Sequence, residues 1–307
     1  MGKSAVLFVN VSKDIAADTA SLIQAELEKC LYKTTIFTFK GKPEPPPSLD
    51  IFKWSNLSEK PPAGKWDIAF CLGGDGTVLY TARCLSPLGV PILHINLGSL
   101  GFIAGVNMDD WISVFRKWEK GEVSLSRRCM FEVSVERDSR IIMKNLCLND
   151  IVISAGGIAK LINLDVHIKS TANVALGSYR SDGLIVATPT GSTAYSMAAG
   201  GPILDPEMEA MIINPICPFS LSSRPFVLPL RDTVSITVAR EQRSDVLLTV
   251  DGQDTFALER SDIVYVKQAL MPALLINTDR QTYYSALRSK LFMYGAGTTR
   301  SNEADNA

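Results

Sequence analysis

Short apolar runs alternate with helical stretches in the first half of the chain. Runs that are apolar on both faces are typical of parallel strands covered on both sides, and helices between such strands predict a doubly wound α/β sheet. The expected strands are Ala5–Val9, Thr34–Phe39, Asp67–Leu72 and Val90–Ile95. Three helices are expected between or after them. The first follows Asp14 and has Ile15, Leu22, Ile23 and Leu27 on one face, the second spans Val78–Leu85, and the third runs from Asn107 or Asp109 to Lys120. The Pro-rich and polar stretch Gly41–Gly64 predicts a surface loop.

The second half of the chain changes to a strict alternation of apolar and polar residues. Stretches such as Phe131–Glu136, Ile162–Lys169 and Val234–Val238 have this period. Alternation is typical of antiparallel strands with one solvated face, so it predicts a β-sandwich. We therefore expect an α/β domain over residues 1–125, a sandwich over residues 126–275 and a polar, disordered tail over residues 295–307. Short helices are expected near Ala194–Ala199 and over Tyr283–Phe292.

Charge and cysteine content exclude several classes of function. The 31 basic and 32 acidic residues give a net charge of −1, which leaves no basic field for DNA or RNA. The six cysteines are not at metal-ligand spacing, and two histidines without an HExxH motif cannot build a His-rich zinc site. No apolar run reaches membrane-spanning length, and no charged-then-apolar leader is present. We expect a cytoplasmic protein with reduced thiols and with neither nucleic-acid nor membrane partners.

A glycine-rich loop, Gly73-Gly74-Asp75-Gly76-Thr77, follows directly after a buried parallel strand. Open α/β sheets bind their ligands at this end of a strand. The three glycines let the backbone take positive φ and let a phosphate approach without a Cβ in the way, while their N–H groups and the start of the next helix are expected to bind the anion. A carboxylate such as that of Asp75 is unfavourable beside phosphates unless it binds a cation or takes a proton. A tight turn in which Asp75 only caps the helix is the alternative.

A second glycine-containing loop, Asn96–Phe102, ends the next apolar strand and is expected at the same sheet edge as Gly73–Thr77. Asn96 offers both a donor and acceptors to a ligand. His94, on the same strand face as Asn96, is expected to be a packed core histidine rather than a catalyst. The polar pair Asn149-Asp150 interrupts an apolar strand, which costs free energy unless the pair binds a ligand or a neighbouring turn.

Small residues and hydroxyls dominate the segment Thr188–Pro202, which follows an apolar strand. Hydroxyls here could satisfy the amides, ribose and phosphates of a dinucleotide, and Tyr195 could stack on a base; a close-packed helix beneath a sheet is the alternative. The segment Ser222–Phe226 includes a candidate cation, Arg224, and Asp251–Gln253 has the composition of a hairpin turn. Each of these last two segments is expected to be structural when taken by itself.

Together these segments closely resemble the ATP-NAD kinase family, and they occur in the family's order along the chain. The most specific match is the run from Asp182 to Ser196, DGLIVATPTGSTAYS. The Gly-Gly-Asp-Gly-Thr loop is less specific, because phosphofructokinases, diacylglycerol kinases and sphingoid-base kinases have similar loops. No GxxxxGK[ST] motif occurs, and no intact GxGxxG follows a strand. The family binds NAD without that dinucleotide fingerprint, which agrees with its absence here.

The resemblance implies an N-terminal α/β domain, a C-terminal β-sandwich with NAD bound between the two, and a terminal helix over 280–293 that packs back on the first domain. It implies transfer of the γ-phosphoryl group of ATP to the adenosine 2′-hydroxyl of NAD, which Asp75 orients and deprotonates. Mg²⁺ or another divalent cation would bind through the ATP phosphates, since no protein metal ligand is assigned. Family members form dimers and tetramers. The implied phosphate loop is Gly73, Gly74, Gly76 and Thr77; the implied NAD-binding residues are Gly76, Asn149, Asp150, Arg180, Asp182, Thr190, Thr193, Ala194, Tyr195, Ser196 and Gln253, with Asn96 and Phe102 as further candidates.

Two positions depart from the family pattern. The acid after Asn149 is often Glu in relatives, so Asp150 is one methylene shorter, and His94 stands where many relatives carry Gly or another small residue. Two alternative functions stay open at this point. A lipid or sphingoid-base kinase would share the glycine loop but would need an apolar groove for an acyl chain. A non-catalytic NAD-binding regulator would be favoured by loss of the loop carboxylate, but Asp75 is present.

Overall fold

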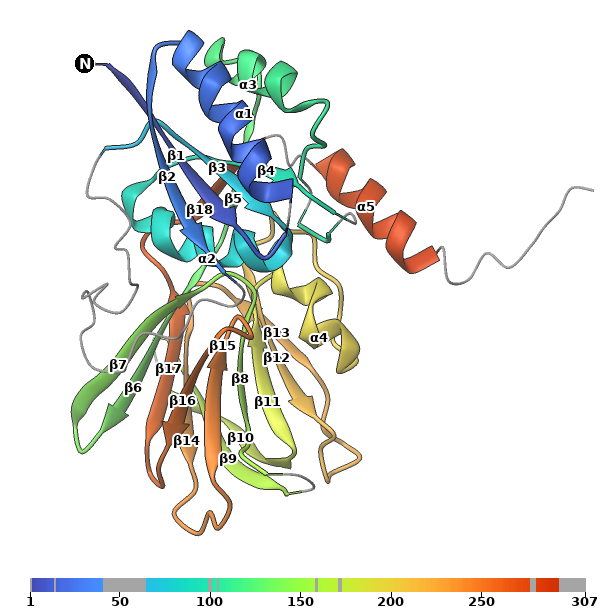
Figure 1. Cartoon of the computed structure of the whole chain (residues 1–307). Helices are drawn as coiled ribbons and strands as arrows, with labels where there is room; N and C mark the ends of the chain where they lie inside the picture. Colours follow the sequence, from blue (N-terminus) through green and yellow to red (C-terminus); the bar gives the residue numbers. More distant parts are fainter. Residues whose placement is uncertain are drawn as a thin grey trace, which may run out of the picture.

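Six strands form the sheet of the first domain, and helices cover both of its faces (Figure 1). In the computed structural model, residues 2–13, 15–40, 65–98, 101–103, 105–157, 160–170, 173–276 and 280–292 are described. All neighbouring strands in this sheet are parallel except the last pair, β18 and β5. The order across the sheet is β2 (Tyr32–Phe39), β1 (Lys3–Asn10), β3 (Ile68–Gly73), β4 (Ile92–Asn96), β18 (Ala273–Ile276) and β5 (Leu125–Arg128).

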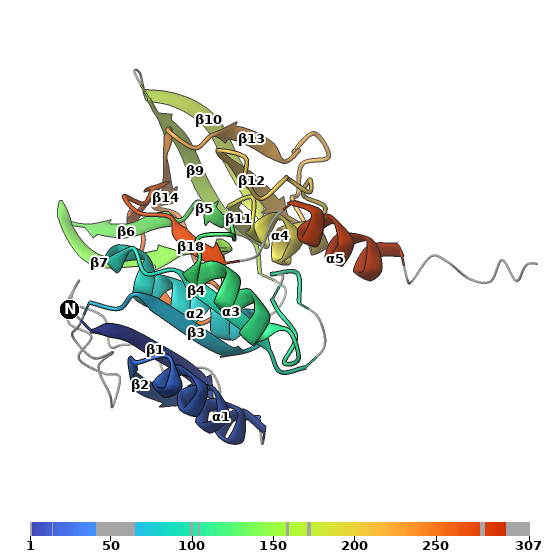
Figure 2. The ribbon, with the colours of Figure 1, turned by 90° about the horizontal axis from the view of Figure 1, so that it is seen from above.

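The helices of the first domain form one layer on each side of this sheet (Figure 2). The helices α1 (Ile15–Lys29) and α3 (Trp111–Glu119) pack on one face, and α2 (Asp75–Leu85) packs on the other before a short turn, η1 (Ser86–Leu88). The predicted apolar face of the first helix is partly wrong, since Ile15 and Leu22 are exposed. Ile23 and Leu27 are buried as predicted, and the smaller residues Ala16, Thr19 and Ala20 complete the buried face of the helix.

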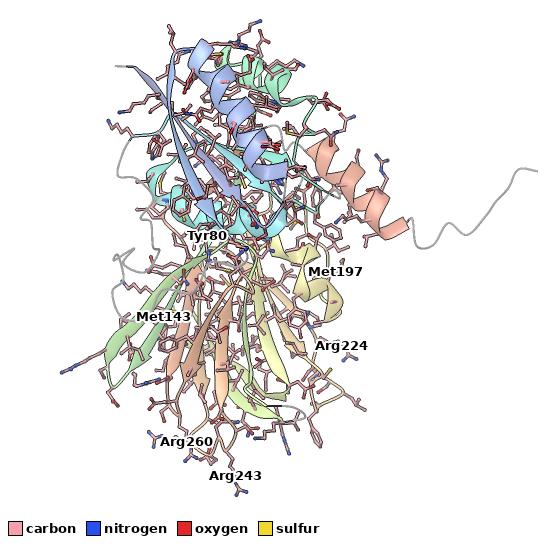
Figure 3. The ribbon with its side chains drawn as sticks, viewed as in Figure 1. Tyr80, Met143, Met197, Arg224, Arg243 and Arg260 are labelled. Carbon is pink, nitrogen blue, oxygen red and sulfur yellow. The ribbon has the colours of Figure 1, made fainter. Side chains whose placement is uncertain are left out.

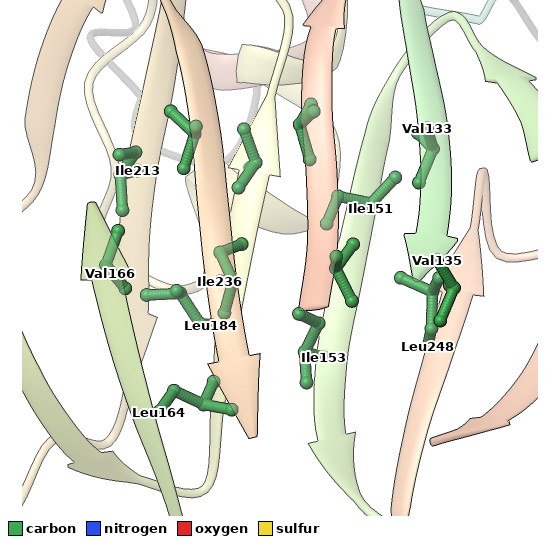
Figure 4. Close-up of a cluster of buried hydrophobic side chains, with 14 of the residues drawn as sticks. Val133, Val135, Ile151, Ile153, Leu164, Val166, Leu184, Ile213, Ile236 and Leu248 are labelled. Carbon is green, nitrogen blue, oxygen red and sulfur yellow. The ribbon is translucent and has the colours of Figure 1, made fainter. Parts of the chain in front are cut away.

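Two antiparallel six-stranded sheets pack face to face and form the second domain. Branched aliphatic side chains from both inner faces interdigitate in its core, including Ile151, Leu184 and Ile236 (Figure 4). The expected fold class, an α/β domain followed by a β-sandwich, is confirmed. One sheet has the order β10 (Asn173–Ser181), β9 (Ile162–Lys169), β14 (Thr233–Val238), β17 (Ile263–Gln268), β6 (Phe131–Arg137), β7 (Arg140–Cys147); the other has the order β13 (Phe226–Pro229), β12 (Ala210–Ile216), β11 (Gly183–Ala187), β8 (Asp150–Ala155), β15 (Val246–Val250), β16 (Asp254–Leu258).

The chain leaves and re-enters the first sheet at its edge. The strands β5 and β18 stand at the two ends of the range expected for the sandwich, yet they pair with each other, and β18 pairs with β4 of the first sheet. This arrangement ties both ends of the sandwich to the α/β domain through backbone hydrogen bonds. The expected cap at Asp14, the loop Gly41–Gly64 and the tail over 295–307 lie outside the described residues.

The short helices η2 (Gly191–Thr193) and α4 (Tyr195–Ala198) follow β11, and α5 (Arg280–Phe292) follows β18. The helix α5 contacts both domains, because Tyr283 Oη donates to the Leu204 carbonyl at 3.1 Å and the Lys290 ammonium lies 4.4 Å from the Phe102 ring centre.

None of the helices within the described residues is long and apolar enough to cross a membrane. The six cysteines are free thiols, of which Cys217 is exposed.

The helix α2 lies at the junction of the two domains. Its residues Val78 and Leu79 belong to the same buried cluster as Met130, Leu148 and Ala269, which stand at the near end of the sandwich. Figure 1 shows α2 directly above the strand ends of the sandwich. The glycine-rich loop at the start of α2 is therefore held where the two domains meet.

Candidate active site

The glycine-rich loop is the tight connection between β3 and α2. The strand ends at Gly73, which is in register with Asn96 of β4, and the helix begins at Asp75. Gly74 is the N-cap residue with extended backbone angles, φ −111° and ψ −168°. None of these glycines is among the residues with positive φ, so the loop does not use the freedom of glycine to adopt that conformation. A strand that runs straight into a helix needs no left-handed residue, so the loop uses the small size of glycine instead.

The glycines of the loop serve two different purposes. A Cβ on Gly73 would lie 2.1 Å from Thr77 Oγ1, so this position is small because Thr77 packs against it. A Cβ on Gly74 would meet nothing within 4 Å, and a Cβ on Gly76 would meet only the side-chain amide of Gln253 at 3.7 Å. The space in front of Gly74 is therefore open to a ligand. The first N–H groups of a helix have no partner within the helix, so α2 presents donors to this space.

The Asp75 carboxylate is held in one orientation by the second loop. Its Oδ2 accepts a hydrogen bond of 2.8 Å from the Phe102 N–H, while its Oδ1 is buried and has no partner among the described residues. Gly101 lies against this carboxylate, since a Cβ on Gly101 would stand 1.7 Å from Asp75 Oδ1. A buried, unbonded carboxylate oxygen costs free energy, so this atom is a candidate acceptor for a ligand hydroxyl or a cation.

We expect Gly101→Ala to lower turnover about 100-fold, because the new methyl group would push the Asp75 carboxylate out of its position. Gly157→Ala is the matched control, since a Cβ there makes only ordinary contacts, the nearest at 3.5 Å. The measurement is the initial rate of product formation. The midpoint temperature of thermal unfolding is measured in parallel, to show that the variant is folded. Normal turnover in Gly101→Ala would show that the exact place of this carboxylate is unimportant.

His94 and Asn96 support the two loops from within. The His94 ring is buried, and its Nε2 donates to the Gly73 carbonyl at 3.1 Å. Burial lowers the pKa of His94, so the ring is neutral and its proton resides on the nitrogen that faces this carbonyl. Because C=O and N–H point in opposite directions across a trans peptide, this bond turns the Gly74 N–H away from His94. The Asn96 Oδ1 accepts the N–H of Gly98 at 3.2 Å and so shapes its own loop.

The pair Asn149-Asp150 stands at the end of the sandwich that faces α2. Asp150 begins β8 and is in register with Ala187 at the end of β11. The Asp251 carboxylate, at the neighbouring end of β15, accepts backbone N–H groups from Leu148 and Asn149, the latter at 2.7 Å. The Asn149 Oδ1 is buried without a partner among the described residues. The turn at Asp251 thus fixes the backbone of this pair and leaves the Asn149 amide available to a ligand.

Asp150 is unusually easy to protonate. Burial, together with the nearby Asp251 carboxylate, raises the pKa of Asp150 to about 7, although the Tyr195 N–H lowers it in part. An unfolded Asp has a pKa near 4. The folded state therefore binds more protons between pH 4 and 7, so ionised Asp150 costs folding free energy above pH 7, and this cost decreases as the pH falls.

We expect Asp150→Asn to stabilise the fold at pH 8 by up to about 4 kcal/mol, because the amide removes the cost of a buried charge. Most of the gain should vanish by pH 5, where the folded wild-type carboxyl is already protonated. Urea unfolding at both pH values measures this difference, and Asp245→Asn, at an exposed position, is the control. An equal gain at both pH values, or no gain at pH 8, would contradict the assigned protonation state.

A buried ionic cluster joins α2 to the β15–β16 turn. The Arg83 guanidinium is ion-paired with Asp254, donates to Gln253 Oε1 at 2.8 Å and lies 3.8 Å from Asp251. Burial opposes the charged form of Arg83, but the two carboxylates outweigh it and raise its pKa. The Gln253 Nε2 in turn donates to the Gly76 carbonyl at 2.7 Å. The turn that holds Asn149 thus also holds the glycine loop, so both are fixed to each other across the domain junction.

The segment after β11 places hydroxyls and small residues beside Asp150. Thr188 Oγ1 donates to the Leu148 carbonyl and accepts from the Gly191 N–H. The predicted residues in this segment differ in whether their side chains are free to bind a ligand. Thr190 Oγ1 is buried and unpartnered within the described residues, whereas Thr193 Oγ1 donates to the Thr190 carbonyl. The predicted residues Ala194 and Ser196 are half-buried and fully buried respectively, and Tyr195 is 47% exposed, so its ring is free to stack.

Arg180 and Asp182 are not brought together with the other predicted residues within one chain. Asp182 precedes β11, which reaches the site only at Ala187, so it stands roughly 15 Å away along the strand. The Arg180 guanidinium stacks 4.8 Å from the Phe219 ring centre. Arg224 donates to carbonyls of its own loop and lies on the flank of the sandwich (Figure 3). The candidate cation Arg224 is therefore remote from the glycine loop.

Arg83, which joins the glycine-loop helix to the turn at Asp251, was not among the residues predicted from the sequence. Its signal was an arginine inside the apolar helical stretch Val78–Leu85, a position that demands a buried acidic partner.

A cavity of about 410 Å³ is lined by residues such as Leu125, Glu207 and Leu270 and includes none of the predicted site residues. In the described part of the chain, no cluster of three or more His, Cys, Asp or Glu side chains could hold a metal ion.

Known proteins resemble this chain over nearly its whole length. The ATP-NAD kinase N-terminal domain model matches residues 3–123, and the ATP-NAD kinase C-terminal domain model matches residues 148–278. A Treponema denticola protein named NAD kinase is 40% identical over 253 residues, which are 82% of this chain and 88% of the relative. A Geobacter sulfurreducens protein of the same name is 40% identical over 225 residues, which are 73% of this chain and 78% of the relative.

Two solved structures share the fold. The crystal structure of yeast NADH kinase complexed with NADH has a TM-score of 0.79 at 23% identity, covering 98% of this chain and 91% of that chain. The structure of an NAD kinase from Archaeoglobus fulgidus in complex with ATP has a TM-score of 0.67 at 23% identity, covering 94% of this chain and 99% of that chain. At these identities the likeness concerns the arrangement of the two domains.

Proposed function

The chain belongs to the ATP-NAD kinase family, and from this premise we propose that the protein transfers the γ-phosphoryl group of ATP to the adenosine 2′-hydroxyl of NAD, giving NADP. The observation that carries the proposal is the state of Asp75. Its carboxylate is oriented by the Phe102 N–H, keeps one oxygen unbonded and stands beside an open glycine loop at the domain junction. A ribose hydroxyl that donates to this oxygen would be placed next to a phosphate on the loop.

Asp75 acts in this mechanism chiefly by positioning the acceptor. The free Oδ1 accepts the hydrogen bond of the 2′-hydroxyl and aligns its oxygen with the γ-phosphorus. The 2′-oxygen then forms a bond to phosphorus, the bond to the β,γ-bridging oxygen breaks, and the hydroxyl proton passes to Asp75. Phosphoryl transfer has a loose transition state, so alignment and charge neutralisation matter more than the strength of the base.

Of the other predicted residues, some are suited to bind the phosphoryl donor, ATP, and others to bind the phosphoryl acceptor, NAD. Gly74, Gly76 and the start of α2 offer N–H groups to the donor phosphates, and a divalent cation arrives with those phosphates as part of the substrate. Asn149, Thr190 and Tyr195 carry unbonded polar atoms or an exposed ring on the sandwich side, which suits the adenosine half of NAD.

One assay tests the proposal directly. Purified protein, Mg²⁺, NAD and a panel of donors are incubated, and NADP is read by an NADP-specific dehydrogenase. We expect NADP with ATP. Labelled ATP offered with diacylglycerol or a sphingoid base tests the lipid-kinase alternative, and phosphate on the lipid but not on NAD would replace the proposal. Tight NAD binding without NADP from any donor would favour a non-catalytic NAD-binding regulator.

We also propose that the protein works in the cytoplasm as a homodimer or homotetramer. Phe219, which packs on Arg180, is exposed, and so is Leu221. Within the described residues β10 and β13 are edge strands, each with a strand partner on one side only. If Arg180 and Asp182 bind NAD, we infer that a second copy supplies them, because within one chain Asp182 stands at the opposite end of β11 from Ala187 and Asp150. Light scattering that gives the mass of a single chain would contradict this proposal.

A further inference from the structure

Lys13 lies at the same sheet edge as the glycine loop. It belongs to the turn after β1, where its N–H donates to the Asn10 carbonyl at 3.3 Å and its own carbonyl accepts the Ala16 N–H at 2.9 Å. These two bonds fix its backbone between the strand and α1. The carboxyl ends of β1, β3 and β4 are level here, since Val9 is in register with Leu72 and Gly73 with Asn96.

The Lys13 side chain reaches the loop that follows β4. Its Nζ lies 3.5 Å from the carbonyl oxygen of Leu97, which follows β4, and a Cβ on Gly98 would stand 2.5 Å from this Nζ. In the sheet, β3 lies between β1 and β4. The loop that the ammonium group reaches is bonded to the end of β3, because the Leu97 N–H donates to the Gly73 carbonyl at 3.3 Å. The Lys13 ammonium group therefore lies beside the start of the glycine loop.

The charge of Lys13 is not neutralised by any carboxylate in the described part of the chain. Other lysines have ion-pair partners there, as Lys3 does with Glu119 and Lys267 with Glu132. Lys13 has only a long contact to a neutral carbonyl, although it is half-buried. A partly buried ammonium group without a counter-charge favours the binding of an anion.

We propose that Lys13 is a substrate-binding catalytic residue, which contacts the phosphates of the phosphoryl donor and stabilises the charge of the transferring group. This inference rests on the proposed function and names the cation that the donor site requires. No P-loop lysine is present, and Arg224 is remote, so the topology of the sheet supplies the cation from the turn after β1. An ammonium group beside the loop would contact the donor oxygens that the helix N–H groups do not reach.

The test compares Lys13→Met and Lys13→Arg in the full-length protein, with Lys33→Met on the exposed face of β2 as the matched control. We expect Lys13→Met to lower kcat/KM for ATP about 100-fold while KM for NAD changes less than about twofold. Lys13→Arg should retain more activity than Lys13→Met, because it keeps the charge. Lys33→Met should behave as the wild type. An effect on stability alone would not separate the two substrates in this way.

The outcomes distinguish this inference from the proposed function. If the wild type forms no NADP from any donor, the proposed function fails. If the wild type forms NADP and Lys13→Met has kcat/KM for ATP within about threefold of it, only the role of Lys13 is overturned. Should Lys13→Met fail to bind NAD or to fold, Lys13→Gln, which keeps a polar side chain without charge, replaces it in the same comparison, judged by the same threshold.

Discussion

Asp75→Asn is expected to bind NAD normally and to lose turnover by about 1000-fold or more. The amide keeps an oxygen to accept the Phe102 N–H, so the loop should retain its shape. It cannot take the proton of the 2′-hydroxyl, and its NH₂ group would stand in the place of the unbonded Oδ1 and offer a donor instead of an acceptor. The measurement is kcat for NADP formation, with the dissociation constant for NAD from titration calorimetry.

The control for this variant is Asp110→Asn, because Asp110 is exposed and makes no side-chain hydrogen bond to cap α3. We expect the control to match the wild type in both measurements. Turnover of Asp75→Asn within about tenfold of the wild type would remove this carboxylate from the mechanism. A lost affinity for NAD with normal kcat would assign it to binding instead.

Arg83→Met is expected to lower the free energy of unfolding by about 3–5 kcal/mol. The substitution preserves most of the side-chain volume but leaves Asp251 fully buried and Asp254 nearly so, without their cation. It also releases Gln253, which holds the Gly76 carbonyl, so turnover should fall as well. Urea unfolding gives the loss of stability, and the NADP assay gives the loss of rate.

Arg116→Met is the comparison for Arg83→Met. Arg116 is exposed and forms a surface ion pair with Glu119 one helical turn away, so its loss should cost less than about 1 kcal/mol. Arg83→Lys should rescue the buried site only in part, since an ammonium group cannot bond both Asp254 and Gln253 in the planar geometry of a guanidinium. A loss below about 1 kcal/mol in Arg83→Met would mean that the cluster does not hold the domains together.

The pattern of apolar and polar residues was sufficient to predict the fold class, because each half of the chain follows one pattern throughout. Apolar runs are typical of central parallel strands covered on both faces, as Ile68–Gly73 is, and alternation such as that in Ile162–Lys169 is typical of a strand with one packed face. The ends of the sandwich could not be predicted in this way. The strands β5 and β18 are short, and their place in the first sheet depends on pairing between residues 125–128 and 273–276.

The site was predictable only where chemistry is local. The position of Asp75 after a buried strand was visible in the sequence, but its partner Phe102 N–H and the close approach of Gly101 depend on the folding of a second loop. Composition does not reveal whether a glycine serves backbone conformation or space, and in this loop the glycines serve space. Lys13 and Arg83 were missed because their roles arise from contacts across 84 and 171 residues.

The most direct measurement is a crystal structure of the full-length protein with NAD and a non-hydrolysable ATP analogue. We expect the adenosine 2′-oxygen within about 2.6–3.2 Å of an Asp75 carboxylate oxygen, with the γ-phosphate on the glycine loop on the far side of that hydroxyl. A dinucleotide bound with its 2′-oxygen beyond hydrogen-bonding reach of Asp75, or with the donor phosphates away from Gly74, would contradict this expectation.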